Sequence, residues 1–145
     1  MDILIRPIKR TDYSKLKPLL DELGYPSSAE DITNRFIELQ KHPDYEGLVA
    51  IKNRQIVGFA GVCKAYYFEM TGKYSRILAF IVSSKERQQG IGTKLLKSCE
   101  QWSIDQGCNA ITLNSGNREE RQIAHTFYKG NGYTGKSTGF VKKLN

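Results

Sequence analysis

Apolar and polar positions in the N-terminal third predict one strand and two helices. Residues 3–5 form a short apolar run that ends at Pro7, which is typical of an edge strand. Apolar side chains then recur at helical spacing over residues 13–23 and again over residues 32–39. Glycine and proline lie between these two stretches and separate them. The pattern therefore predicts a strand followed by two amphipathic helices.

The middle of the chain predicts three strands. Residues 48–51 and 55–67 are strand-like, and Asn53-Arg54 lies between them in the position of a hairpin turn. Residues 77–82 form a nearly continuous apolar run, which predicts a central strand buried on both faces. We expect the first two of these strands to be antiparallel.

The C-terminal part predicts two more helices and three short strands. Residues 92–102 carry a helical apolar stripe, and residues 110–113 follow as a strand, so that a right-handed, parallel β-α-β unit is expected. Residues 121–131 form the next helical pattern and end in glycines. Two short strands, 133–134 and 140–144, complete the prediction.

This order of elements predicts an α/β fold. A mixed, mostly antiparallel sheet of six to seven strands is expected, with four helices beside it. A chain of 145 residues is long enough for one continuous core and too short for two. We therefore expect a single domain over residues 1–145 with one active site.

The charge of the chain favours an anionic ligand. Lys and Arg number 22 against 15 Asp and Glu, which gives a net charge of +7. These basic residues are scattered and do not form a stripe with interleaved aromatic side chains. A phosphate-rich cofactor is therefore favoured over nucleic acid.

The sequence shows no sign of a metal centre, a disulfide framework or a membrane span. Its 3 cysteines are odd in number and have no C-x-x-C spacing. No apolar run approaches the roughly 20 residues that cross a bilayer, and the N-terminus lacks a signal-peptide pattern. We therefore expect a cytoplasmic protein with reduced thiols, no metal and no membrane partner.

The most informative segment runs from Arg87 to Thr93 and reads Arg-Gln-Gln-Gly-Ile-Gly-Thr. It lies between a strand and a helix, where glycines let the backbone approach a ligand and the first helical amides attract an anion. A Walker A loop needs lysine directly after the second glycine, where this chain has Thr93. The dinucleotide fingerprint needs a third glycine where it has Leu95. The segment therefore favours another kind of pyrophosphate cradle.

Two segments carry a resemblance to a known family. Residues 87–93 resemble the Arg/Gln-x-x-Gly-x-Gly/Ala signature of the GNAT superfamily of N-acetyltransferases. Residues 124–133 resemble the family's Ala-x-x-Phe-Tyr helix, which glycine and an aromatic residue follow. Both blocks occur in the family's order, and the resemblance covers the chain from about Ile3 to Leu144. It implies the GNAT fold and transfer of an acetyl group from acetyl-CoA to a primary amine.

The resemblance also implies which residues bind acetyl-CoA (coenzyme A). The backbone of Phe80, Ile81 and Val82 is expected to bond the pantetheine arm and to polarise the thioester carbonyl. The remaining expected cofactor residues lie in the pyrophosphate loop and near the thiol: Arg87, Gln88, Gln89, Gly90, Ile91, Gly92, Thr93, Asn114, Arg121, Ala124, Phe127 and Tyr128.

Tyr128 is the catalytic residue that the resemblance implies. The departing CoA thiolate needs a proton, and a phenol with a pKa of about 10 is protonated at neutral pH. Leu78 stands where many GNAT enzymes have glutamate, so no carboxylate base is expected on that strand. We expect the amine to lose its proton through ordered water. Glu69 is the carboxylate nearest in sequence that could replace the missing glutamate as a base.

The acceptor site is expected at the first two helices and a nearby strand edge, with Tyr25, Tyr67 and Glu69 as substrate-binding residues. The turn at residues 23–26 and the helix at residues 124–128 resemble the small-amine branch that includes aminoalkylphosphonate N-acetyltransferases. This implies a small-molecule amine acceptor. Acetylation of a protein lysine or N-terminus, a non-catalytic CoA-binding or nucleic-acid-binding module, and a homodimer stay open.

Overall fold

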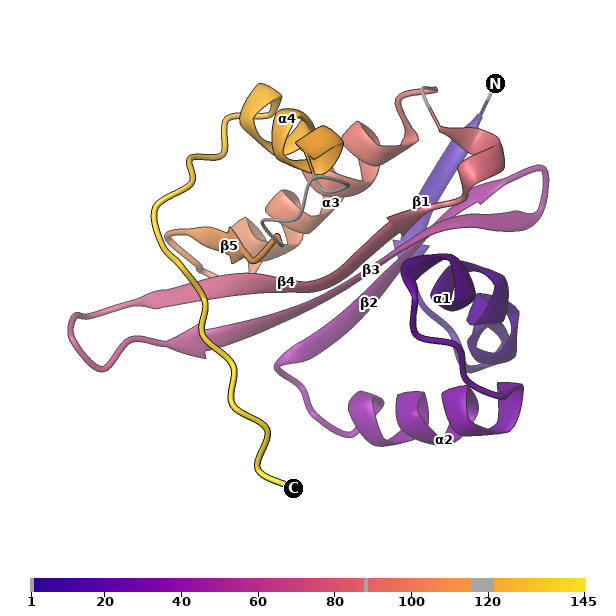
Figure 1. Ribbon diagram of the computed structural model, residues 1–145, viewed down its shortest axis with the longest axis horizontal. Coiled ribbons are helices and arrows are strands. Elements are labelled where there is room, and N and C mark those ends of the chain that lie inside the picture. The colour runs from indigo at the N-terminus through magenta and orange to yellow at the C-terminus, as the bar shows by residue number, and fades with distance from the viewer. Residues whose placement is uncertain (1, 88, 116–121) are drawn as a thin grey trace. The chain divides into compact units, whose positions relative to one another are not determined.

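The computed structural model describes residues 2–87, 89–115 and 122–145. The chain forms two compact units, Met1–Thr112 and Leu113–Asn145, and each is described by itself. Figure 1 labels the helices and strands. In chain order the elements are β1 (Ile3–Pro7), the 3-10 helix η1 (Arg10–Leu16), α1 (Lys17–Leu23), α2 (Ala29–Gln40), β2 (Tyr45–Lys52), β3 (Gln55–Tyr66), β4 (Lys73–Val82), the 3-10 helix η2 (Ser84–Glu86), α3 (Ile91–Asp105), β5 (Ile111–Leu113) and α4 (Gln122–Gly130).

The sheet has five strands in the order β1-β2-β3-β4-β5. The first four pair antiparallel with their neighbours. The turn between β2 and β3 has positive φ at both Asn53 (50°) and Arg54 (66°), as a two-residue hairpin of the primed type requires. The predicted hairpin is therefore confirmed.

Helices cover both faces of the sheet in the N-terminal unit. Figure 1 shows α1 and α2 on one side of β2, β3 and β4 and α3 on the other. Val49 and Phe59 belong to the core under the N-terminal helices, whereas Ala50 packs with Ile91 of α3, because side chains alternate between faces along a strand. Val57 packs with Ile91 as well, because the pairing of β2 and β3 shifts register between Ala50 and Ile51. The apolar alternation of β2 and β3 thus builds two cores.

The predicted first helix is divided into η1 and α1. Pro18 lies at the beginning of α1, and because proline has no backbone N–H, an α-helix cannot continue through it with all its hydrogen bonds. The start of η1 is held by Asp12, whose carboxylate accepts 2.7 and 3.1 Å hydrogen bonds from Arg6 and a 2.7 Å bond from Lys9 N. The hydrogen bonds from Arg6 lower the pKa of Asp12 below its usual range.

The expectation that residues 77–82 are buried on both faces is confirmed only at Ile77 and Ile81, because Ala79, Phe80 and Val82 are half-buried and Leu78 is exposed. Leu78 is 52% exposed, whereas Ile77 and Ile81 are buried. The strand pairing shifts register here, with Gly61 opposite Ala79 and Val62 opposite Ile77. This shift leaves Leu78 without a partner in β3.

The C-terminal unit contains α4 and the tail that follows it. The predicted strands at 133–134 and 140–144 are absent, so the described residues contain five strands and not six to seven. Residues 134–139 are polar or glycine, and Phe140 and Val141 are more than nine-tenths exposed. Little apolar surface is therefore buried to offset the entropy of ordering a strand there.

Candidate functional site

A glycine begins the helix that follows the predicted pyrophosphate loop. Gly90 is the N-cap of α3 and has a φ of 80°, and no side chain caps this end of the helix. The first amides of a helix have no partner within it, so those of the first turn of α3 can bind an anion. A Cβ added to Gly90 would meet no atom within 4 Å. This end of α3 is thus open and unblocked by protein atoms, as a bound pyrophosphate requires.

Two cations fix the residues that lead into this helix. Lys52 Nζ donates to Glu86 Oε2 at 2.5 Å and to Gln89 Oε1 at 3.1 Å. The Lys52 side chain is only 15% exposed, so this contact is sheltered from water. Arg87 Nε donates to the Val82 carbonyl at 3.2 Å, and its Nη2 lies 3.7 Å from Glu22 Oε1.

Two loop residues that were expected to bind the cofactor contact protein groups instead, and their cofactor contacts stay predictions. In this structure the side chains of Arg87 and Gln89 bind protein groups, and they orient the loop. Gln88 lies outside the described residues. Sequence reasoning missed Lys52, which lies 37 positions before its partner Gln89 and has no local motif around it.

The backbone expected to bind pantetheine lies at the end of β4. Ile81 pairs with Phe59, and Val82 pairs with Gly58, both in β3. On its other side β4 has ten residues and β5 only three, so β5 pairs with only part of that edge. The arrangement allows an extended ligand chain to lie along the rest of β4, which keeps the expected role of Phe80, Ile81 and Val82 as a proposal.

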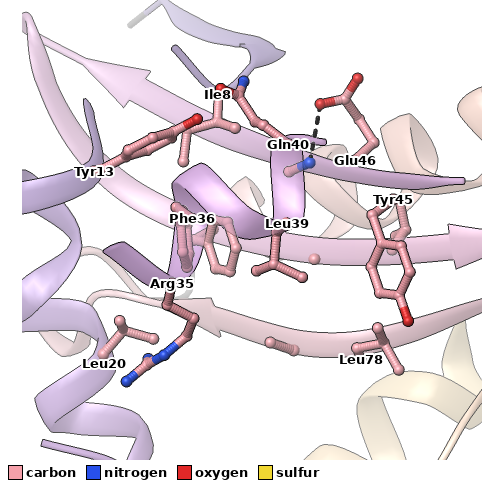
Figure 2. Close-up of a pocket in the computed structure, with 15 residues that line it drawn as sticks. Ile8, Tyr13, Leu20, Arg35, Phe36, Leu39, Gln40, Tyr45, Glu46 and Leu78 are labelled. Carbon is pink, nitrogen blue, oxygen red and sulfur yellow. Dashed lines mark hydrogen bonds between the residues drawn. The ribbon is translucent and has the colours of Figure 1, made fainter. Parts of the chain in front are cut away.

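A small cavity lies between α2 and the sheet. It has a volume of about 220 Å³. Figure 2 shows its lining side chains, which are mostly apolar. Tyr45 and Leu78 are 41% and 52% exposed, so the cavity opens to solvent beside them. The residues lining the cavity are Ile8, Tyr13, Leu20, Arg35, Phe36, Leu39, Gln40, Tyr45, Glu46, Gly47, Phe59, Gly61, Val62, Leu78 and Ala79.

Two residues that line this cavity, Tyr13 and Glu46, carry polar groups with few or no hydrogen-bond partners. The hydroxyl of Tyr13 is buried and has no hydrogen-bond partner among the described residues. The carboxylate of half-buried Glu46 accepts a 3.0 Å bond from its neighbour Gly47 N. Burial raises the pKa of Glu46, and the bond from Gly47 only partly opposes this. Sequence reasoning missed both residues as site residues, because Tyr13 fits the apolar stripe of a helix and Glu46 stands in no motif.

A second hollow adjoins the first and contains one predicted substrate residue. The two share Leu20, Arg35, Leu78 and Ala79, and the second is also lined by residues 23–27, including Tyr25. The turn at residues 23–26 therefore lies where the acceptor site was expected.

The other two predicted substrate residues lie elsewhere in the same unit. Tyr67 follows β3, where its hydroxyl donates to Asn109 Oδ1 at 2.7 Å and its ring lies 4.9 Å from that of Tyr74. Glu69 is exposed in the connection between β3 and β4. Neither residue lines the two hollows, so the structure does not bring them together with Tyr25.

The remaining predicted residues belong to the C-terminal unit. Ala124, Phe127 and Tyr128 lie on α4, and Asn114 belongs to the same unit. The ring of Tyr128 lies 5.3 Å from that of Phe127 and 5.9 Å from that of Tyr133. Arg121 lies outside the described residues. The tyrosine is thus held in a cluster of aromatic rings.

The described residues contain neither a group of metal-ligating side chains nor a helix that could span a membrane. In the part of the chain that the structure describes, no group of three or more His, Cys, Asp or Glu side chains is arranged to hold a metal ion. None of the described helices has the length and apolar composition to cross a bilayer.

Comparison with known proteins gives the class of this enzyme. The sequence model of the Acetyltransferase (GNAT) family matches residues 11–133. A GNAT family acetyltransferase of Staphylococcus aureus is 38% identical, with a TM-score of 0.87 and coverage of 99% of this chain and 100% of that one. No curated protein matches the chain.

More distant structures share the fold. Glucosamine-6-phosphate N-acetyltransferase from Arabidopsis thaliana is 22% identical, with a TM-score of 0.83 and full coverage of both chains. Aminoglycoside 6'-N-acetyltransferase from Acinetobacter baumannii is 19% identical, with a TM-score of 0.83 and coverage of 99% of each chain.

These matches and the open N-terminus of α3 define an acyl-CoA-dependent N-acetyltransferase. The chain belongs to the GNAT acetyltransferase family, and acetyl-CoA is its co-substrate. The predicted family, fold class and co-substrate are therefore confirmed.

The open space at Gly90 gives a test of the pyrophosphate site. Gly90→Ala adds a methyl group that meets no protein atom but enters the space we assign to the pyrophosphate. We expect the Kd for acetyl-CoA in titration calorimetry to rise at least about tenfold, as the loss of one charge-assisted hydrogen bond does. The variant should keep its fold in circular dichroism.

Gly24→Ala is the matched control for this variant. Gly24 has a φ of 98° and equally open surroundings, so alanine there meets the same unfavourable left-handed conformation, at about 1–2 kcal/mol. Its Kd for acetyl-CoA should stay at the wild-type value. An unchanged Kd in Gly90→Ala, or equal losses in both variants, would remove the loop from the cofactor site.

Proposed function

We propose that this acetyltransferase acetylates the primary amine of a small molecule, which binds in the cavity between α2 and the sheet. The apolar lining of that cavity carries the proposal. The cavity has a volume of about 220 Å³, and the second hollow that adjoins it has about 600 Å³, so that each is of the order of the roughly 300–1,000 Å³ of most ligand pockets. An aliphatic part of the acceptor suits the apolar walls of the cavity. Leu78 and Ala79 line it next to the β4 residues proposed to bind the thioester.

The chain's own residues have three tasks in the proposed reaction. The first amides of α3 hold the pyrophosphate, in a loop that Lys52 and Arg87 orient. Backbone groups at Phe80–Val82 polarise the thioester carbonyl. The amine nitrogen, as the free base, attacks the carbonyl carbon, the carbon–sulfur bond breaks, and Tyr128 gives its proton to the departing sulfur. The nitrogen loses one proton as the amide forms, and ordered water takes up that proton and returns one to Tyr128.

Direct attack by the amine fits the state of the cysteines. A thiol must ionise before it can act as a nucleophile. Burial raises the pKa of Cys99 to about 12, and burial also raises the pKa of Cys63. Both thiols are therefore protonated at neutral pH. An acyl-cysteine intermediate has no activated nucleophile at either position.

The acceptor class is tested by a screen with acetyl-CoA. Aliphatic amines, amino sugars, amino acids and a lysine-containing peptide are supplied in turn, and release of free thiol is followed. We expect release with a small aliphatic amine and little with the peptide, because the cavity walls are mostly apolar and suit an aliphatic chain better than a polar peptide backbone. Faster release with the peptide would favour a protein acceptor and overturn the small-molecule proposal. The cytoplasmic location and the homodimer stay predictions.

Tyr128→Phe tests the proposed general acid. The substitution keeps the ring that contacts Phe127 and Tyr133 but removes the hydroxyl. We expect kcat to fall by at least tens of fold, because positioned proton donors contribute about a hundredfold or more. The Kd for acetyl-CoA should change little, which places the loss in the chemical step.

Tyr133→Phe is the control, since it removes a hydroxyl from the neighbouring ring of the same cluster. It should retain most of the wild-type kcat. Wild-type turnover in Tyr128→Phe would mean that water protonates the thiolate unaided, and the role of Tyr128 would be withdrawn.

A further inference from the structure

We infer that Arg35 forms an anion subsite where the two hollows adjoin, and that it binds the carboxylate of an acceptor whose amine stands at the other end of a short aliphatic chain. The acceptor is thus a short ω-amino acid. The inference rests on the proposed function, because it specifies the chemistry of the acceptor that these hollows take. It concerns only residues of the N-terminal unit.

The position of Arg35 is the first reason. It lies on α2 and lines both the cavity between that helix and the sheet and the second hollow. Among the described residues it is the only lysine, arginine or histidine that lines either of them. Figure 2 shows its guanidinium beside Leu20, at the other end of the drawn residues from Tyr45 and Glu46. An anion that enters either hollow therefore meets one cation, which is Arg35.

The unused donors of Arg35 are the second reason. A guanidinium has five N–H donors, and in the described part of the chain only Nη2 is engaged, by a 2.9 Å bond to Ser27 Oγ. None of the ion pairs between described residues includes Arg35. Asp31 and Glu38 stand at helical spacing from it and could pair with it, but Glu38 pairs with Lys41 at 3.0 Å instead. The remaining donors are thus available to a ligand.

The turn after α1 holds the guanidinium in place. Ser27 lines the second hollow, and its carbonyl accepts a 2.9 Å bond from Lys17 Nζ at the start of α1. Its hydroxyl accepts the bond from Arg35, so the arginine is oriented by a residue that is itself tied to a helix. A side chain that is oriented before the ligand arrives loses less conformational entropy on binding. Arg35 is also exposed, so a small molecule can reach it from solvent.

The residues that the two hollows share allow one small molecule to reach both Arg35 and the thioester. Leu78 and Ala79 line both hollows, and they directly precede the Phe80–Val82 backbone that we propose polarises the thioester carbonyl. Leu20 lines both hollows too, so methylene groups suit the space between the two ends of the acceptor. The same apolar walls shield the ion pair from water, which strengthens it relative to a pair on the open surface.

A single cation favours a carboxylate over a doubly charged group. A carboxylate carries one negative charge, and its two oxygens match the planar fork of a guanidinium. A phosphate group carries close to two charges at neutral pH, and the second would have no partner in the described lining of the hollows. The neighbouring cation Lys17 already contacts the Ser27 carbonyl and lies 3.4 Å from Asp21 Oδ1.

The experiment compares ω-amino acids of two to six carbons with n-alkylamines of the same chain lengths. Titration calorimetry on the full chain saturated with CoA gives the Kd for each compound without turnover. We expect the best ω-amino acid to bind at least about tenfold more tightly than the matching alkylamine. Arg35→Gln should weaken binding of that amino acid about tenfold to a hundredfold, as the loss of a hydrogen-bonded charge pair does. Its Kd for the alkylamine should not change.

Two further variants distinguish an ion pair from a structural role. Arg35→Lys keeps the charge but loses the planar fork, so it should retain only part of the preference for the amino acid. Arg54→Gln is the control, because Arg54 lies in the turn between β2 and β3, lines neither hollow, and its replacement lowers the net charge by the same amount. This control should bind both compounds as the wild type does. If Arg35 only held the turn at Ser27, Arg35→Gln would weaken both compounds alike and lower the thermal midpoint.

Equal affinities for amino acids and alkylamines, wild-type amino-acid affinity in Arg35→Gln, equal losses for both compounds, or no binding would each overturn the subsite. An aminoalkylphosphonate of the same length is a second arm, and tighter binding of it than of the amino acid would overturn the assignment to a carboxylate.

Because binding is measured without turnover, the proposed function is judged separately. A chain that binds ω-amino acids through Arg35 but acetylates no amine keeps the subsite and loses the function. A chain that acetylates alkylamines and shows no preference for amino acids does the reverse.

Discussion

The contact of Tyr13 and Phe59 with Phe36 is the interaction on which the rest of the structure depends. The ring of Phe36 in α2 lies 5.3 Å from that of Tyr13 in η1 and 5.6 Å from that of Phe59 in β3. These three rings join both N-terminal helical segments to the sheet. Loss of one buried phenylalanine side chain typically costs about 3–5 kcal/mol, a large part of the roughly 5–15 kcal/mol by which a domain is stable.

The same contact shapes the cavity in which we propose that the acceptor binds. All three rings line the cavity, so the residues that stabilise the helices on the sheet also form its floor. Packing the Tyr13 ring in this place buries its hydroxyl without a protein partner. The cofactor loop lies at the start of α3, on the opposite face of the sheet from this core. The sheet thus lies between the two regions that we propose bind acetyl-CoA and the acceptor.

Features that depend on local sequence were predictable, and features that depend on distant contacts were not. The helix that begins after Gly90 and the hairpin turn at Asn53 follow from adjacent residues, and both were predicted correctly. The role of the Gly90 loop in binding pyrophosphate stays a prediction. The division of the first helix at Pro18 could have been predicted too, because the signal is the proline itself. By contrast, the contact between Lys52 and Gln89 joins residues 37 positions apart, and only the sheet brings them together.

The errors have one physical origin. An apolar residue such as Leu78 or Val141 was assigned to a buried strand, but the apolar pattern cannot show whether a partner surface exists. Glu46 was overlooked for the converse reason. A glutamate in a strand normally faces water, whereas Glu46 is half-buried by residues distant in sequence. Local patterns therefore predict elements well and predict the environment of a side chain poorly.

The most direct test of the central claim is to fill the cavity and measure transfer. A Cβ at Gly61 would lie 3.5 Å from Phe59 Cζ, an ordinary contact, and a longer side chain built on it would extend into the cavity that Gly61 lines. The measurement is acceptor-dependent release of free thiol by Gly61→Leu with the best small amine. Our account predicts at least a tenfold loss with unchanged affinity for acetyl-CoA and an unchanged thermal midpoint. Wild-type release would show that the acceptor binds elsewhere.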